Sequence, residues 1–178
     1  MLKVSTFCVA MALSLSACGG SSSSDPNKTQ TPASAPTSIS QAIAQAESTG
    51  QIPTLNRDDT VAGPTTNGVR NDIAAYINSL PDTAVQKKAL LQDAAALQLA
   101  LTVDTTNQAA MLDVGQKIMK SSHCMFQQYG TTDAPKKSGD LEKFTVNTKA
   151  RFDAYEKFNN AMSGTTLKSV ITGADCEQ

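Results

Sequence analysis

Apolar side chains recur at helical spacing through most of the chain after residue 37. The clearest case lies within 82–102, where apolar residues stand at i, i+4, i+7 and i+11, the pattern of a helix face buried against a core. These residues are Leu90, Ala94, Leu97 and Leu101. The same spacing runs from Met111 through Val114 and Ile118 to Met125. Weaker patterns predict helices over 38–50 and 69–80.

The last predicted helix opens near Ser138–Asp140 and ends at Ser163-Gly164. The apolar or partly apolar positions that define its stripe are Leu141, Phe144, Thr148, Phe152, Tyr155 and Met162. Phe158 departs from this stripe. We therefore expect Phe158 to be exposed, which makes it a candidate contact residue for a partner.

Turn-forming residues separate the predicted helices. Gly50 closes the first helix, Pro81 ends the second, and Asp82 is expected to cap the third. Asp104–Asn107 supplies a turn and a further cap. The segment 52–68 is rich in turn formers and is expected to be an ordered loop.

The fold class follows from these helices and their short connections. No stretch alternates long enough to predict a sheet, and the tail 165–171 is compatible with an extended or a helical conformation. The sequence thus predicts a mainly α domain over 38–178, a small antiparallel helical bundle with an ordered N-terminal loop.

The first seventeen residues have the pattern of a secretory signal. Lys3 supplies one positive charge, and the run 4–15 is apolar apart from serine and threonine. A transmembrane helix needs roughly 20 apolar residues, so this run is too short to span a bilayer.

The run ends in Leu15-Ser16-Ala17-Cys18-Gly19, which resembles the lipobox of bacterial lipoproteins. The resemblance implies lipid transfer to the Cys18 thiol, cleavage before Cys18 and acylation of the new amine. In Gram-negative species, a glycine after the cysteine implies transport to the outer membrane. An ordinary signal peptide cleaved after Ala17 remains the alternative.

The segment 18–37 is predicted to be a lipidated, disordered tether. It contains glycine, serine and three prolines but no large apolar side chain, so it cannot bury enough surface to offset its ordering entropy. A flexible chain of this length spans roughly 25 Å. The predicted organisation is a signal peptide over 1–17, the tether, and the helical domain over 38–178.

The cysteines predict one disulfide. Cys8 leaves with the signal and Cys18 carries lipid, so Cys124 and Cys176 remain as a pair in an oxidising compartment. Closing this loop of about 53 residues should contribute roughly 4 kcal/mol in the chain-entropy model. A disulfide between two chains is an alternative.

Two further interpretations of Cys124 start from its neighbour His123. A Cys–His nucleophile pair needs side chains that face each other, whereas adjacent helix residues point about 100° apart. A metal site needs more ligands, and His123 is the only histidine in the chain.

The loop around Asn67-Gly68 resembles the calcium loops of EF-hand-like and thrombospondin-type repeats. With Gly68 at the sixth loop position, acids are missing at most ligand positions. The remaining candidate calcium ligands are Asp58, Asp59, Asn67 and Asp72. The alternative is a turn in which Gly68 adopts a positive φ.

The net charge and the absence of catalytic motifs narrow the range of functions that the sequence supports. The formal charge of −1 becomes −2 when Lys3 is removed, so the protein has no field that would gather nucleic acid. We find no catalytic motif and no residues that imply a cofactor. The mixed charges of 140–157 are typical of a solvated helix face.

We therefore expect a non-enzymatic, lipid-anchored protein of the outer membrane, facing the periplasm. Its expected partners are the membrane, through the lipid on Cys18, and an envelope protein, as for an immunity or inhibitor protein or an envelope assembly factor. The alternatives are an envelope hydrolase with an unrecognised site and a calcium-responsive surface module.

Overall fold

A computed structural model describes residues 39–58, 60–168 and 176 of the 178-residue chain. The chain divides into two units, Met1–Ala35 and Pro36–Gln178, and every described residue belongs to the second. The predicted signal peptide, Cys18 and the tether therefore lie outside the described residues. None of the helices in the described part of the chain has the length and apolar composition that a bilayer crossing requires.

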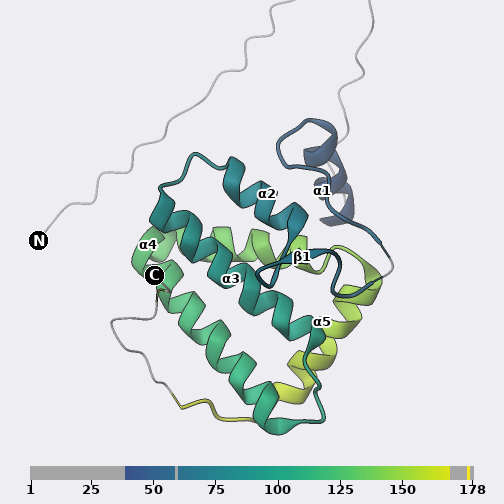
Figure 1. The fold of residues 1–178 in the computed structure, drawn as a ribbon, viewed down its shortest axis with the longest axis vertical. Coiled ribbons are helices and arrows are strands. Elements are labelled where there is room, and N and C mark those ends of the chain that lie inside the picture. The colour runs from purple at the N-terminus through teal and green to yellow at the C-terminus, as the bar shows by residue number, and fades with distance from the viewer. Residues whose placement is uncertain (1–38, 59, 169–175, 177–178) are drawn as a thin grey trace, which may run out of the picture. The chain divides into compact units, whose positions relative to one another are not determined.

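The domain is mainly helical, which confirms the predicted fold class. Its elements are α1 (Ile39–Ser48), β1 (Thr65–Thr66), β2 (Val69–Arg70), α2 (Asn71–Ser79), α3 (Ala84–Thr102), α4 (Gln108–Thr145) and α5 (Lys149–Met162). A short loop joins α3 to α4, and the first half of α4 returns alongside α3 (Figure 1).

The core lies where α2 and α4 pack against α3. Its most deeply buried apolar side chains are Ile73 and Ile77 of α2, Leu90 of α3, and Met125 and Leu141 of α4. The predicted stripe of α3 is buried throughout. Burial of these side chains supplies the main favourable term in folding.

α4 and α5 differ from the prediction. A helix expected to open near Ser138–Asp140 is instead the second half of α4, and Gly130, with a φ of 71° and a ψ of −177°, kinks α4 into two halves. The single helix predicted to reach Ser163 is broken after Thr145, and Thr148 caps the new helix α5 by accepting a hydrogen bond from the Arg151 backbone N–H.

The N-terminal cap of α3 is also one residue from its predicted place. Thr83, rather than Asp82, accepts from the Gln86 backbone N–H, and the Gln86 side chain accepts in return from the Thr83 N–H. Asp82 instead accepts from Tyr129 and Lys137 of α4, each at 2.8 Å. The predicted cap at Asn107 is confirmed, because its side chain accepts from the Ala110 N–H.

A two-stranded hairpin replaces the predicted start of α2. Thr65 pairs with Arg70 and Thr66 with Val69, in antiparallel register. Asn67 and Gly68 form the turn with φ values of 52° and 77°, both in the left-handed region that favours an Asn-Gly pair. The positive φ predicted for Gly68 is confirmed, and α2 begins at Asn71 rather than Val69.

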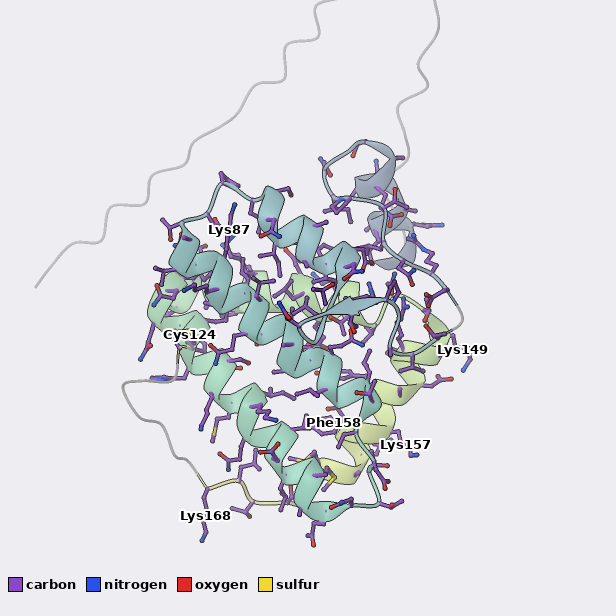
Figure 2. The ribbon with its side chains drawn as sticks, viewed as in Figure 1. Lys87, Cys124, Lys149, Lys157, Phe158 and Lys168 are labelled. Carbon is purple, nitrogen blue, oxygen red and sulfur yellow. A yellow bond between two sulfur atoms is a disulfide. The ribbon has the colours of Figure 1, made fainter. Side chains whose placement is uncertain are left out.

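The predicted disulfide joins Cys124 of α4 to Cys176, with Cα atoms 5.0 Å apart and a sequence separation of 52. Figure 2 shows Cys124 on the first half of α4. Gln116 of the same helix donates to the Lys168 carbonyl at 2.8 Å. The chain after α5 is therefore held against α4 at two described points, one of them covalent.

Candidate functional site

Two buried arginines organise the end of the domain at which α4 meets α5. The side chain of Arg70 is 0% exposed. It donates to both oxygens of Asp72, at 2.7 and 2.9 Å, and to the carbonyls of Phe144 and Thr145 in the last turn of α4. Its remaining N–H donates to the side-chain oxygen of Asn147. All five guanidinium N–H groups thus have acceptors, as a buried cation requires.

Arg151 of α5 occupies the same region and is equally buried. Its guanidinium donates to the loop that precedes the hairpin, through the side chains of Asn56 and Asp58 and the carbonyls of Asn56, Thr60 and Val61. A further bond goes to Asn147 at 2.9 Å. Arg151 therefore fixes four described residues of this loop, Asn56, Asp58, Thr60 and Val61, against α5.

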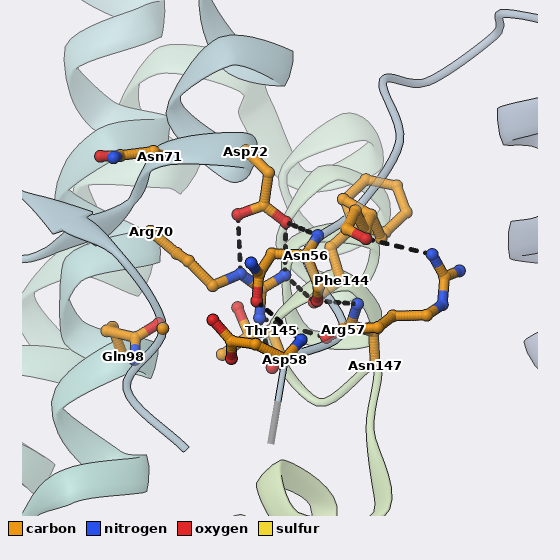
Figure 3. A network of polar contacts seen from close by, with 12 residues as sticks. Asn56, Arg57, Asp58, Arg70, Asn71, Asp72, Gln98, Phe144, Thr145 and Asn147 are labelled. Atoms are coloured by element: carbon orange, nitrogen blue, oxygen red, sulfur yellow. Dashed lines mark hydrogen bonds and ion pairs between the residues drawn. The ribbon is translucent and has the colours of Figure 1, made fainter. Parts of the chain in front are cut away.

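Asn147 joins the two arginines in one network. Its side-chain oxygen accepts from Arg70 and Arg151, and its amide donates to the Asn56 carbonyl at 3.0 Å. The Asn56 N–H in turn donates to Asp72 at 2.7 Å. Figure 3 shows Asn56, Asp58, Asp72, Thr145 and Asn147 gathered around Arg70. We call this group the arginine network.

The charges of the arginine network balance. Burial pushes the pKa of Asp72 upward, but hydrogen bonds from Arg70 and from the Asn56 N–H outweigh burial and leave that pKa lowered. The pKa of Asp58 is lowered mainly by its hydrogen bond from Thr60. Burial and the neighbouring charge of Arg70 lower the pKa of Arg151. Two cations therefore face two carboxylates, and the network holds chain segments together.

The arginine network adjoins a cleft of about 810 Å³. The cleft is lined by Ile43, Ala44, Glu47, Arg57, Gly139, Glu142, Lys143, Val146, Asn147, Thr148, Lys149 and Phe152. These residues come from α1, the loop, the end of α4 and the start of α5. Asn147 belongs to both the cleft wall and the network. The volume of the cleft lies within the range of ligand-binding clefts.

Phe152 is the largest apolar side chain of this cleft and is 47% exposed. We call the site the Phe152 cleft. Where α1 and the loop line the cleft, Arg57 donates two hydrogen bonds to the Glu47 carboxylate, of 2.9 and 2.8 Å. Burial raises the pKa of Glu47, but the bonds from Arg57 and the Leu55 N–H more than compensate, so that pKa is lowered. Lys149, which also lines the cleft, is exposed and forms an ion pair with Asp153.

A second hollow of about 270 Å³ continues from the Phe152 cleft, because Gly139 and Glu142 line both. It lies over the kink of α4 and contains Pro135 and Phe126, which is 44% exposed. Phe126 and Phe152 are two of the four large apolar side chains exposed in the described part of the chain.

A buried carboxylate ties both halves of α4 to α3. Asp93 of α3 accepts from Ser121 at 2.7 Å and from Ser138 at 2.6 Å, one serine on each side of the kink. Burial raises the pKa of Asp93, and the two serine hydrogen bonds only partly offset this. Asp93 therefore fixes the angle of the kink.

The structure brings Asp58 and Asp72 together, but as partners of the two arginines. Asp72 and Asp58 belong to the arginine network, Asn67 is in the hairpin turn, and Asp59 lies outside the described residues. Among the described residues, no three His, Cys, Asp or Glu side chains lie together in a way that could hold a metal ion.

The expected exposure of Phe158 is wrong. Phe158 is 3% exposed and lies on the inner side of α5, in a cluster with Met111 and Val114 (Figure 2). The break after Thr145 gives α5 its own helical phase. Its inward face is therefore Arg151, Tyr155 and Phe158, and Phe152 turns outward.

Sequence reasoning missed Arg70, Arg151 and Asn147, the centre of the network. One signal was present: Arg151, Tyr155, Phe158 and Met162 stand at i, i+4, i+7 and i+11, the same spacing as the buried stripe of α3. An arginine in such a register marks a buried cation whose partners lie elsewhere in the chain.

No protein-family model matches this chain, and the searches of curated proteins and of solved structures found no match either.

Proposed function

We propose that this protein is a lipid-anchored lipoprotein of the bacterial envelope whose helical domain binds another envelope protein. The anchor is supported by the signal pattern over 1–17 and the lipobox-like run that ends in Cys18. Several acyl chains hold a protein stably, because each buried CH₂ contributes about 0.8 kcal/mol. The proposed location is the periplasmic face of the outer membrane.

Partner binding rests on one observation, the exposure of Phe152 in a cleft that also includes Asn147, which Arg151 holds in place. Large aromatic side chains that remain half exposed in a pre-formed hollow are typical anchors of protein interfaces. Glu142 and Lys149 place both signs of charge beside Phe152. We propose that the occupant is an amphipathic segment of the partner, with apolar residues against Phe152 and charged residues at both rims.

The anchor predicts the behaviour of two cysteine variants. In a Gram-negative host fed an alkyne analogue of palmitate, we expect the wild-type protein to be labelled and to sediment with membranes. Cys18→Ala should lose the label and the sedimentation, because the acceptor thiol is gone. Cys8→Ala is the matched control and should retain both, since Cys8 is removed with the signal. Label on Cys18→Ala would contradict the proposal.

The Phe152 cleft can be tested by site-specific crosslinking. p-Benzoylphenylalanine at position 152 should give one discrete adduct on irradiation in cells, and mass spectrometry should map it to an amphipathic segment of an envelope protein. The matched position is Val85, an exposed apolar side chain of α3 that does not line the cleft. The same adduct from both positions, or none from position 152, would exclude the cleft as the binding site.

A further inference from the structure

A second surface lies on α3, beside the edge of the core. Besides its buried stripe, α3 carries a row of apolar residues four apart, Leu91, Ala95 and Leu99. Leu91 and Ala95 are half-buried and pack against the edge of the core. Leu99 is 36% exposed. The row therefore leaves an apolar strip of α3 that the described residues cover only in part.

The surface beside this row is hollowed. One hollow of about 510 Å³ lies between α3 and the hairpin with α2, and another of about 220 Å³ lies between α3 and α4. They meet at Gln92 and Ala95, so they form one continuous depression, which we call the α3 groove. In Figure 1, α3 crosses the front of the domain with the hairpin on one side and α4 on the other.

Lysines flank the α3 groove at both ends. Lys88 lines the first hollow, Lys117 and Lys120 line the second, and no carboxylate among the described residues lines either. Lys117 forms an ion pair with Asp113 at 2.9 Å, and both side chains are largely exposed to solvent. Lys88 and Lys120 form no ion pair with another described residue. The groove therefore presents positive charge around an apolar floor.

We propose that the α3 groove binds an acidic amphipathic helix of a partner protein. A row of residues four apart is the ridge by which two helices pack, and Ala95 permits close approach at the centre. From Lys88 to Leu99 the groove runs roughly 17 Å at 1.5 Å per residue, which matches a helix of three turns. Leucines of that helix fill the hollows, and its carboxylates face the lysines.

A folded segment fits this surface better than a lipid bilayer does. A bilayer presents a flat array of headgroups, whereas the α3 groove offers two hollows that side chains can enter. The surface is distinct from the Phe152 cleft, and none of its lining residues is shared with that cleft. Binding at the α3 groove can therefore be tested independently of binding at the Phe152 cleft.

The test titrates the purified full chain into a fluorescent, end-capped 16-residue helix with leucines at i, i+4, i+7 and i+11 and glutamates between them. We expect saturable binding in the micromolar range, weakened by added salt because screening acts on exposed charges. Combining Lys88→Glu with Lys120→Glu should weaken binding at least tenfold. Lys157→Glu reverses an exposed lysine of α5 outside the groove and is the matched control, which should leave binding unchanged.

Two further probes separate the alternatives. A peptide of the same composition in scrambled order keeps the charge but loses the apolar face, and should bind at least tenfold more weakly. Vesicles containing phosphatidylglycerol test the lipid surface. The inference is overturned if the scrambled peptide binds equally well, if Lys157→Glu weakens binding as much as the double variant, or if the helix does not saturate below millimolar concentration. It is equally overturned if only the vesicles respond to the double variant.

Discussion

At the scale of single residues, buried charge is tolerated here only with complete hydrogen bonding. Arg70 and Arg151 each use every guanidinium N–H, and their positive charges face Asp72 and Asp58. Asp93 is different, because two neutral serines are its hydrogen-bond partners and no cation is among them. Its ionised form is therefore the costly one, and its contribution to stability must depend on pH.

Asp93→Asn should remove that pH dependence. Because burial raises the folded-state pKa of Asp93 above its ordinary value of 3.8, its stabilising contribution is complete below that value and declines as pH rises towards the folded-state pKa. Asparagine can accept from Ser138 and donate to Ser121, whose hydroxyl can turn to the Ile118 carbonyl 2.9 Å away. The free energy of unfolding of the variant, relative to wild type, should therefore increase between pH 3.5 and pH 7.

Urea unfolding at a series of pH values measures this difference. The carboxylates with lowered pKa values act in the opposite direction, since their stabilisation is lost as pH falls. They are common to both proteins and cancel in the comparison. A difference that stayed constant, or that shrank as pH rose, would show that Asp93 is not a raised-pKa group.

At the scale of elements, interruptions of helical structure create the sites. The kink at Gly130 lets Ser121 and Ser138 reach one carboxylate, and the break after Thr145 sets the phase of α5 that exposes Phe152. The last carbonyls of a helix lack intrahelical donors, and Arg70 donates to the buried carbonyls of Phe144 and Thr145 in the last turn of α4. The loop before the hairpin must approach both arginines closely, which constrains its backbone.

Gly63→Ala tests that close approach. Gly63 has a φ of +64°, and a Cβ there would lie 2.9 Å from Arg70 Cδ and 3.0 Å from Arg151 Nη2. Gly50→Ala is the matched control, because Gly50 has a φ of +71° but open space around it. Left-handed backbone should cost each variant about 1–2 kcal/mol. The fixed arginines should cost Gly63→Ala a further 1–3 kcal/mol or so through overpacking.

Chemical denaturation of the two variants in parallel separates the two costs. If Gly63→Ala and Gly50→Ala lose the same free energy of unfolding, the arginine side chains move aside for the new methyl group. The arginine network would then be less constrained than its hydrogen bonds indicate.

At the scale of the whole molecule, covalent closure secures the C-terminal end. The disulfide removes freedom from a loop of 52 positions in the unfolded chain. For a domain whose net stability is about 5–15 kcal/mol, this is a large contribution. It also places Cys176 against Gln127 and Gln128 of α4.

Replacing the pair with Cys124→Ala and Cys176→Ser should lower the free energy of unfolding by about 4 kcal/mol in the chain-entropy model. Alanine suits position 124 because the Cys124 side chain is buried. Guanidinium unfolding measures the loss, and reduced wild-type protein should match the double variant. Identical midpoints for oxidised and reduced wild-type protein would refute the stabilising role.

The sequence by itself determined the helical class, the loop before Asn67, the positive φ of Gly68, the Asn107 cap and the Cys124–Cys176 pair. These features depend on local periodicity, on backbone sterics and on there being two cysteines in the helical domain. Tertiary structure decided the break before α5, the burial of Phe158 and the arginine network. Arg70 meets the Thr145 carbonyl across 75 positions, and no local pattern encodes a partner at that separation. The phase of α5, and with it the Phe152 cleft, follows from those distant hydrogen bonds.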